Sequence, residues 1–217
     1  FGHVSAWSFC QDKIMTTGGE GGMVTTNDES LWRKMWSFKD HGKSYEAVYE
    51  RDHPAGFRWV HDSFGTNWRM TEMQASIGRI QLQRMSEWTR LRNRNASILS
   101  AKFNEFDHDK GLLRIPRLNC GSCDKFGCEN FAEGCVHAYY KYYVFIRPDN
   151  LADGWSRDRI IEEITSEDIP CLQGSCSEVY LEKAFDGTDF RPDERLAVAK
   201  RLGETSLIFL VHPTLLI

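Results

Sequence analysis

The first 26 residues place short apolar runs on either side of a glycine-rich segment. From Trp7 onward, short apolar runs alternate with the run Thr17-Gly18-Gly19-Glu20-Gly21-Gly22, and the strand-like Met23-Val24-Thr25-Thr26 follows. Glycine adopts backbone conformations that other residues avoid, so a run of glycines favours tight turns. The pattern predicts a strand, a loop and a second strand between Trp7 and Thr26.

A helical period follows the second predicted strand. Asn27-Asp28-Glu29-Ser30 can cap a helix, and Leu31, Met35 and Phe38 then lie four and three residues apart. We expect this helix to pack its apolar face on the sheet.

Residues 40–67 show no sustained period and are rich in Gly, His, aromatic and charged residues. This composition predicts a long ordered loop with a functional role.

A long helix is predicted next. Thr71-Glu72-Met73-Gln74 fits a capping box, in which Thr71 and Gln74 satisfy each other's backbone amides. Apolar residues then keep a roughly helical spacing, which predicts one long helix or a bent pair to about Phe106. The residues with this spacing are Met73, Ile77, Ile80, Met85, Trp88 and Leu91. Such a helix could bridge two domains.

Beyond Pro116 the pattern is typical of an α+β unit. We expect a cysteine-rich loop, a strand over 139–146, a helix near 157–166, an irregular segment over 171–178 and a final strand near 207–211. Because the composition changes within the long helix, residues 1–90 and 91–217 are the predicted domains.

Composition limits the classes of protein that this chain can represent. With 217 residues and 41% hydrophobic positions, it can bury one sizeable core or two small ones. The net charge is -4 and the Lys and Arg residues are scattered, so we expect no nucleic-acid partner. The apolar runs fall far short of the roughly 20 residues of a membrane helix, so we expect no membrane partner.

The amino end and the cysteines bear on processing and compartment. Phe1-Gly2-His3-Val4-Ser5 has neither an initiator Met nor the regions of a secretory signal, so we interpret it as a cut end. The seven cysteines are an odd number and nothing indicates export, so we expect a cytoplasmic protein.

Four of the cysteines lie in one segment with a metal-like spacing. Cys120, Cys123, Cys128 and Cys135 are separated by two, four and six residues, with His137 just beyond. Four thiolates can close a tetrahedral zinc site, but the paired C-x2-C knuckles of a strong zinc motif are missing. Reduced thiols or disulfides formed during handling are the alternative, so we assign no metal site.

The segment Ser8-Phe9-Cys10-Gln11-Asp12-Lys13 offers the clearest chemistry. A lysine that forms a Schiff base must lie beside its cofactor, with part of its charge relieved by desolvation or nearby cations. A Ser five residues earlier can offer its hydroxyl to a phosphate, and the glycines after Lys13 let the backbone approach a ligand. By spacing alone, an ordinary exposed lysine beside a glycine-rich turn explains the segment more simply.

A resemblance changes this interpretation. The segment resembles the Ser-Phe-x-x-x-Lys-x-x-x-x-Gly-Glu-Gly-Gly signature of the DegT/DnrJ/EryC1/StrS family of sugar aminotransferases, with one extra Gly before Glu20. Asp40-His41-Gly42-Lys43 is similar to the family's His-Gly. Residues 64–75 are similar to its Asn-Tyr-Arg-Met-Thr-Glu-Leu-Gln-Ala segment, with Trp68 in place of Tyr. Ser206-Leu207 and His212-Pro213-Thr214-Leu215 resemble its closing segment.

The resemblance implies an α/β fold of the PLP-transferase type I, aspartate-aminotransferase-like class. Residues 1–90 would be the carboxy-terminal part of the large PLP-binding domain, and residues 91–217 the smaller α+β domain. The implied cofactor is pyridoxal 5'-phosphate (PLP). The implied reaction moves an amino group from an amino acid donor, expected to be glutamate, to a keto group of a nucleotide-linked sugar. The implied assembly is a homodimer with shared active sites.

The resemblance also implies roles for individual residues. Lys13 would carry the cofactor and move a proton between cofactor and substrate, and Ser8 would bind the cofactor phosphate. Asn67 would reach the phosphate in the neighbouring subunit's site. Arg69 is a candidate contact for the nucleotide-sugar or the amino donor, because a guanidinium pairs well with phosphate and carboxylate. An ordinary ion pair is the alternative for Arg69.

Three further residues lie where the family's sites lie. His41 could approach the active site from its loop, although a histidine satisfied by backbone partners is the simpler interpretation. Glu178 and Tyr180 occupy positions where the family's small domain lines the sugar pocket, and other members often carry His there. Substrate identity therefore stays open.

Two other functions compete with transamination. A PLP-dependent sugar dehydratase of the same fold would carry His in place of the lysine, and a non-catalytic scaffold or regulatory protein would keep the fold without turnover.

Only twelve residues precede Lys13, so the residue that pairs with the cofactor's pyridine nitrogen would lie upstream. We expect residues beyond about 90 to fold alone, residues 1–90 to need another chain, and the 217 residues by themselves to bind the cofactor weakly without measurable turnover.

Overall fold

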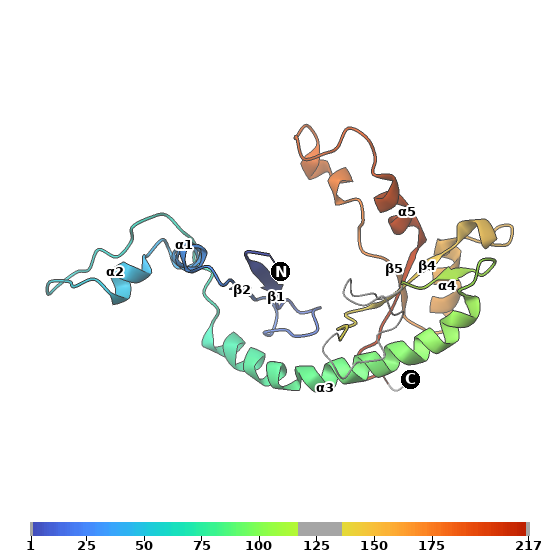
Figure 1. Ribbon diagram of the computed structural model, residues 1–217, viewed down its shortest axis with the longest axis horizontal. Helices are drawn as coiled ribbons and strands as arrows, with labels where there is room; N and C mark the ends of the chain where they lie inside the picture. Colours follow the sequence, from blue (N-terminus) through green and yellow to red (C-terminus); the bar gives the residue numbers. More distant parts are fainter. Residues whose placement is uncertain (1, 117–135, 216–217) are drawn as a thin grey trace. The chain divides into compact units, whose positions relative to one another are not determined.

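The chain divides into two compact units within one long helix. The computed structural model describes residues 2–116 and 136–215. The first unit is Phe1–Met85 and the second is Ser86–Ile217, so the division falls inside helix α3, Glu72–Phe103 (Figure 1). The boundary predicted near residue 90 lies in the same helix. Assigning the units to the large and small domains of an aminotransferase stays a prediction.

The first unit begins with the predicted strand, loop and strand. Strands β1, Ser5–Ser8, and β2, Gly22–Thr25, pair antiparallel, and Ser8 lies opposite Gly22. Helix α1, Glu29–Lys39, follows, and Asp28 caps it by accepting the Leu31 amide at 3.0 Å. Both predictions of secondary structure are confirmed.

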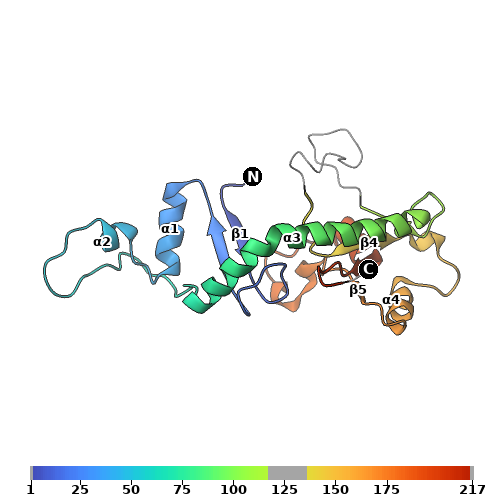
Figure 2. The ribbon, with the colours of Figure 1, turned by 90° about the horizontal axis from the view of Figure 1, so that it is seen from below.

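Helix α1 does not pack on this hairpin in the predicted way. It lies next to the hairpin but contains no buried residue, and Phe38 is half exposed (Figure 2). A groove with a volume of about 1020 Å³ lies between them, lined by Trp7 and Met23 of the hairpin and Met35 of the helix. The physical reason is that two strands of four residues are too small a sheet to cover a helix.

Residues 40–67 are ordered but contain more structure than a loop. A short helix, α2, Tyr45–Tyr49, begins where Ser44 accepts the Ala47 amide at 3.0 Å. Two isolated antiparallel bridges, Asp40 with Asn67 and Lys43 with His61, fold the segment back on itself. Five helical residues are too few to show a hydrophobic period, which is why the sequence did not predict α2.

The predicted capping box and the long helix are both confirmed. The Thr71 amide donates to Gln74 Oε1 at 2.9 Å, and the Gln74 amide donates to Thr71 Oγ1 at 3.3 Å. Helix α3 then continues for 32 residues to Phe103, and a 3₁₀ turn over Asn104–Phe106 ends it near the predicted position.

The second unit contains a four-stranded antiparallel sheet with helices α4 and α5 (Figure 1). Its strands, in the order β3-β4-β6-β5, are Leu113–Arg114, Tyr142–Ile146, Ser206–Phe209 and Cys171–Gln173, and its helices are Arg157–Ser166 and Ala197–Thr205. The predicted strands near 139–146 and 207–211 and the helix near 157–166 are confirmed. The irregular segment predicted over 171–178 is partly wrong, because it begins with β5. Strands of two and three residues are too short to show an alternation.

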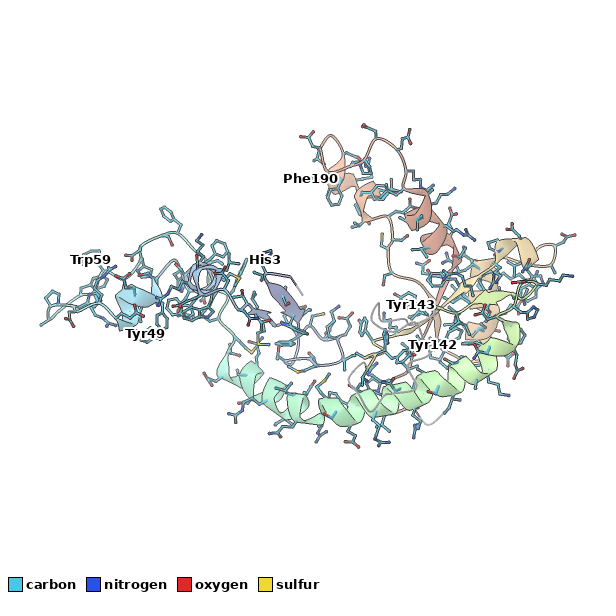
Figure 3. All side chains as sticks on the ribbon, in the orientation of Figure 1. His3, Tyr49, Trp59, Tyr142, Tyr143 and Phe190 are labelled. Carbon is cyan, nitrogen blue, oxygen red and sulfur yellow. The ribbon has the colours of Figure 1, made fainter. Side chains whose placement is uncertain are left out.

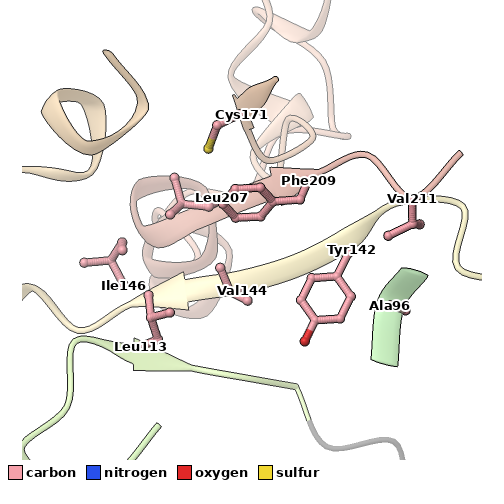
Figure 4. Close-up of a cluster of buried hydrophobic side chains, with 9 residues drawn as sticks. All are labelled: Ala96, Leu113, Tyr142, Val144, Ile146, Cys171, Leu207, Phe209 and Val211. Atoms are coloured by element: carbon pink, nitrogen blue, oxygen red, sulfur yellow. The ribbon is translucent and has the colours of Figure 1, made fainter. Parts of the chain in front are cut away.

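One apolar core holds the second unit together (Figure 4). Its buried members are Ala96, Leu113, Tyr142, Val144, Ile146, Cys171, Leu207, Phe209 and Val211. Ile160 and Ile164 of α4 and Phe103 of α3 pack against them. Because each large buried apolar side chain contributes about 1.5–3 kcal/mol, this core supplies the unit with its main stabilisation.

Metal-binding groups and membrane-spanning helices can be assessed only for the residues that the structure describes. Within it, no group of His, Cys, Asp and Glu residues could hold a metal ion. Cys120, Cys123, Cys128 and Cys135 lie outside the described residues, so the zinc alternative is not tested. Among the described helices, none combines the length and the apolar composition needed to cross a lipid bilayer.

Candidate active site

Lys13 lies in the loop that joins β1 to β2, residues 9–21, which we name the lysine loop. The Phe9 amide donates to Gly21 O at 2.8 Å, and the Thr17 amide donates to Phe9 O at 3.1 Å. The Lys13 amide donates to Cys10 O at 3.1 Å, which closes a tight turn at the lysine. The backbone of the loop therefore extends the hairpin and fixes where the Lys13 side chain begins.

The Lys13 amine lies near the surface beside a carboxylate. Lys13 Nζ is 3.6 Å from Asp12 Oδ1, and the side chains are 37% and 59% exposed. Cys10 Sγ donates to the same Asp12 oxygen at 2.5 Å. An ion pair this exposed is weak, so it does not hold the amine away from a ligand. The Ser8 hydroxyl lies at the end of β1, where it accepts the Cys10 amide at 3.4 Å.

The glycines of the lysine loop meet a steric requirement. Gly18 and Gly19 have φ angles of +82° and +139°, which other residues rarely adopt. A Cβ atom on Gly21 would lie 2.1 Å from Thr17 Oγ1, which is buried and donates to Glu20 O at 3.0 Å. The glycine-rich run is therefore needed for the loop to close over Thr17.

One face of α3 holds the lysine loop in place. Gln74 Nε2 donates to Glu20 O at 2.7 Å, and the Thr16 amide donates to Gln81 Oε1 at 2.9 Å. Between them, Gly78 lets the helix approach the loop, since a Cβ there would lie 3.0 Å from Thr17 Cγ2. Sequence reasoning identified Gln74 only as a cap and did not identify Gln81. The capping residue of the helix thus also fixes the end of the lysine loop.

A second polar cluster forms around Asp40, which is 8% exposed. Arg69 Nη1 donates to Asp40 Oδ1 at 3.0 Å, and Arg69 Nε donates to Asn67 Oδ1 at 3.1 Å. Arg69 Nη2 is 3.3 Å from His41 Nε2. The structure therefore brings Asn67, Arg69 and His41 together. The residue at their centre, Asp40, was not identified from the sequence, although a charged residue next to the His-Gly pair was the available signal.

The lysine loop and the cluster around Asp40 differ in their position relative to the groove of the first unit. Arg69 lines that groove together with Gln74 and Lys39. Ser8, Lys13 and Asn67 are not among its lining residues. Within the described part of the chain, the four predicted site residues thus occupy two clusters instead of one pocket. Their predicted roles in binding cofactor and substrate stay predictions.

In the second unit, the side chains of Glu178 and Tyr180 are joined by a hydrogen bond. Tyr180 Oη donates to Glu178 Oε1 at 2.7 Å and accepts the Leu196 amide at 2.9 Å. Arg195 donates to both Glu178 oxygens, at 2.7 and 2.6 Å. The Arg195 hydrogen bonds lower the pKa of Glu178 to about 2, with a smaller effect from Tyr180. These contacts brace residues 178–196 and leave the expected role in a sugar pocket untested.

Replacing Gln74 by Ala should loosen the lysine loop. The change removes the donor to Glu20 O and half of the capping box, and one lost hydrogen bond corresponds to a roughly two- to tenfold faster amide exchange. Hydrogen–deuterium exchange over residues 9–21 measures it. Gln83→Ala changes an exposed position of the same helix and serves as the control. Equal exchange in both variants would contradict the proposed support.

The ion pair of Glu178 should make stability depend on pH. Because its pKa falls from 4.5 to about 2 on folding, the stabilisation is present above pH 4.5 and is lost as the pH falls toward 2. The free energy of unfolding of the native chain should therefore exceed that of Glu178→Gln above pH 4.5, and the difference should shrink below it. Urea denaturation at a series of pH values tests this. A difference that stays constant to pH 2 would show that the carboxylate charge is not involved.

Comparison with known proteins identifies the family. The pattern of the DegT/DnrJ/EryC1/StrS aminotransferase family matches residues 1–216. The crystal structure of the aminotransferase from Psychrobacter cryohalolentis is 64% identical, with a TM-score of 0.86 over 99% of this chain and 52% of that chain. This likeness confirms the predicted mixed α/β aminotransferase fold.

Two curated relatives add to this comparison. GDP-perosamine synthase from Escherichia coli O157:H7 is 36% identical over 104 residues, which are 48% of this chain and 26% of that protein. A putative L-glutamine:3-amino-2,3-dideoxy-scyllo-inosose aminotransferase from Micromonospora echinospora is 31% identical over 216 residues, 94% of this chain and 42% of that protein. The chain thus spans less than half the length of both. It belongs to the DegT/DnrJ/EryC1/StrS family of PLP-dependent sugar aminotransferases.

Proposed function

We propose that this chain supplies the cofactor lysine of an enzyme that transfers an amino group to a keto group of a nucleotide-linked sugar. Glutamate is the proposed donor, and glutamine, which the Micromonospora relative's name contains, is the competing one. The observation that carries the proposal is Lys13 in a glycine-rich loop whose backbone is fixed by α3. A lysine at the surface of a rigid loop can bind a cofactor in one defined place.

The residues of the lysine loop fit PLP. The Lys13 amine is partly exposed, the Ser8 hydroxyl lies at the strand end beside the loop, and a Cβ on Gly19 would meet nothing within 4 Å. Thr16 Oγ1 is buried with no hydrogen-bond partner among the described residues. A phosphate needs hydroxyl and backbone donors with room to approach, and the loop offers these.

The proposed work is divided among the residues of this chain. PLP, when bound, supplies an electron sink for the substrate carbon. Lys13 Nζ accepts a proton from one carbon and returns it to another, which requires the amine to stay within hydrogen-bond reach of both. The Ser8 hydroxyl donates to a phosphate oxygen. The hydrogen bonds from Gln74 and Gln81 keep the loop from moving during these steps.

The proposed enzyme is a homodimer in which Asn67 serves the partner's site. Large apolar side chains lie exposed in the first unit, including Tyr49 and Trp59 (Figure 3). Phe57, Phe64, Trp68 and Met73 share this exposure, each above 65%. Extended apolar surface is typical of a protein interface, which supports the proposal that more protein covers this unit. We propose that a second copy and a region preceding Lys13 do so.

The competing functions differ in the chemistry at residue 13. A dehydratase of this family would carry His there, so Lys13 favours transamination. A regulatory protein without turnover could keep the lysine, so only cofactor attachment together with amino transfer separates it from an enzyme. A coupled assay with a nucleotide-linked keto sugar, run separately with glutamate and with glutamine, decides the reaction and the donor.

Cofactor attachment should depend on Lys13. We expect borohydride reduction of the complete enzyme with PLP to leave a pyridoxyl group on Lys13, and we expect Lys13→Ala to lose both the label and amino transfer. Peptide mapping by mass spectrometry measures the label. Lys102→Ala, at a side chain that is 79% exposed, is the control and should keep both. A pyridoxyl group on any other lysine would refute the assignment.

Shared active sites predict complementation between two defective variants. Lys13→Ala removes the amine, and Asn67→Asp places a carboxylate beside the phosphate. If Asn67 acts in the partner's site, a mixed dimer keeps one intact site, so random mixing should restore about a quarter of the native activity. The measurement is amino transfer after the two proteins are unfolded and refolded together. No recovery beyond the separately refolded variants would place Lys13 and Asn67 in the same subunit's site.

A further inference from the structure

We propose that Asp40 and Arg69 are positioning residues that hold the Asn67 amide ready to donate to an oxygen of the cofactor phosphate. This inference rests on the proposed function, because it takes Asn67 to be a phosphate ligand. It gives Arg69 a different role from the one expected from the sequence. The guanidinium supports a neighbouring side chain and does not contact the substrate.

Each of the three nitrogens of the Arg69 guanidinium faces a partner within the cluster. Its Nε, Nη1 and Nη2 atoms lie 3.1 Å from Asn67 Oδ1, 3.0 Å from Asp40 Oδ1 and 3.3 Å from His41 Nε2. A guanidinium has five donors in a rigid plane and no acceptor. Three of the five N–H groups can therefore be engaged within the cluster, which fixes the plane of the guanidinium.

The contact with Arg69 determines which way the Asn67 amide faces. Because Arg69 Nε can only donate, the atom of Asn67 that faces it must be the oxygen. The two N–H groups of Asn67 Nδ2 are then the donors left for another partner. Asn67 is exposed, and its Nδ2 forms no hydrogen bond with the residues that the structure describes. An Asn67 amide held in this orientation directs its two N–H groups away from Arg69, where they can donate to an anionic oxygen.

The backbone around the cluster is rigid enough to keep this orientation. The His41 amide donates to Thr66 O and the Trp68 amide donates to Lys39 O, both at 3.0 Å, which places Asn67 opposite Asp40. A Cβ on Gly42, whose φ is +87°, would lie 1.8 Å from Ser63 O. The two segments are therefore joined by hydrogen bonds and by a close approach that only glycine permits.

The charges around Asp40 favour an anion beside the cluster. Lys43 Nζ and Lys39 Nζ lie 3.5 and 3.9 Å from the Asp40 carboxylate, in addition to Arg69. Three cations thus surround one carboxylate that is 8% exposed. The excess positive charge of these side chains attracts an anionic ligand. The buried Asp40 carboxylate fixes the orientation of the Arg69 guanidinium. Removing Asp40 would leave Arg69 without its strongest partner.

The test uses the complete enzyme and a double-mutant cycle. Asp40→Asn keeps the shape but removes the charge. Arg69→Lys keeps the charge but loses the planar guanidinium, whose separate nitrogens reach Asp40 and Asn67. Titration of the apoenzyme with PLP, followed by absorbance, gives the cofactor Kd. We expect each variant to weaken PLP binding about tenfold, which is the usual effect of one charge-assisted hydrogen bond. Neither change should weaken binding further in an Asn67→Ala background.

Two substitutions in the same segment are the matched controls. Arg51 and Asp62 form an ion pair of 3.1 Å that is similar to the Arg69–Asp40 pair, so Asp62→Asn and Arg51→Lys should leave the Kd unchanged. Thermal melting of each apoenzyme verifies that the variants fold. The KM for the nucleotide-sugar should change by less than about twofold in Asp40→Asn and Arg69→Lys if neither residue contacts it.

The outcomes separate this inference from the proposed function. Additive effects in the cycle, or a rise in the KM for the sugar in Arg69→Lys with an unchanged PLP Kd, would overturn the positioning role. If Asn67→Ala binds PLP as well as the native enzyme does, the inference fails and so does the proposed role of Asn67 as a phosphate ligand, while amino transfer through Lys13 stands. If PLP does not attach to Lys13, the proposed function fails and the inference fails with it.

Discussion

The hydrogen bonds between α3 and the lysine loop are the contacts on which the first unit depends. Gln74 and Gln81 bond the loop backbone at 2.7 and 2.9 Å, and Gly78 between them lets helix and loop approach. Strand β2 has no buried residue, and neither does α1, so these two elements give the loop little apolar support. Apolar side chains reach the loop from elsewhere, because Ile77 and Met70 lie close to Gly18 and Gly21. The placement of Lys13 therefore depends on these hydrogen bonds together with glycines that let the loop and its neighbours approach closely.

The second unit is stabilised in a different way. Its sheet buries every residue of β6, and α4 covers the core through Ile160 and Ile164. Asn95 of α3, which is fully buried, donates to His212 O at 3.0 Å and ties the helix to the segment after β6. A unit with such a core can hold an irregular segment like residues 178–196 by local ion pairs, and the Glu178–Arg195 pair does this.

The Asp40 cluster shows how a polar site can be organised without a pocket of its own. A buried carboxylate fixes a guanidinium, and the guanidinium fixes the amide of Asn67. In an arrangement of this kind the residue that meets the ligand is the last of three, and the other two determine its orientation. The lysine loop follows the same principle, because Gln74 and Gln81 support a residue that they do not touch. In both clusters the support comes from side chains that hydrogen-bond to a second segment of the chain.

Local patterns in the sequence determined the local structure. Asp28 before α1, the Thr71–Gln74 box before α3 and the glycines after Lys13 each act within a few residues, so their effect could be predicted without a fold. The family motif likewise marked Ser8, Lys13, Asn67 and Arg69. Helix α5 escaped prediction because Leu196 gives it no side-chain cap. Only the tertiary structure decided that Gln81 meets Thr16, 65 positions away, and that Asp40 meets Arg69, 29 positions away. Contacts across such distances depend on how the chain folds back, and no pattern of neighbouring residues records that.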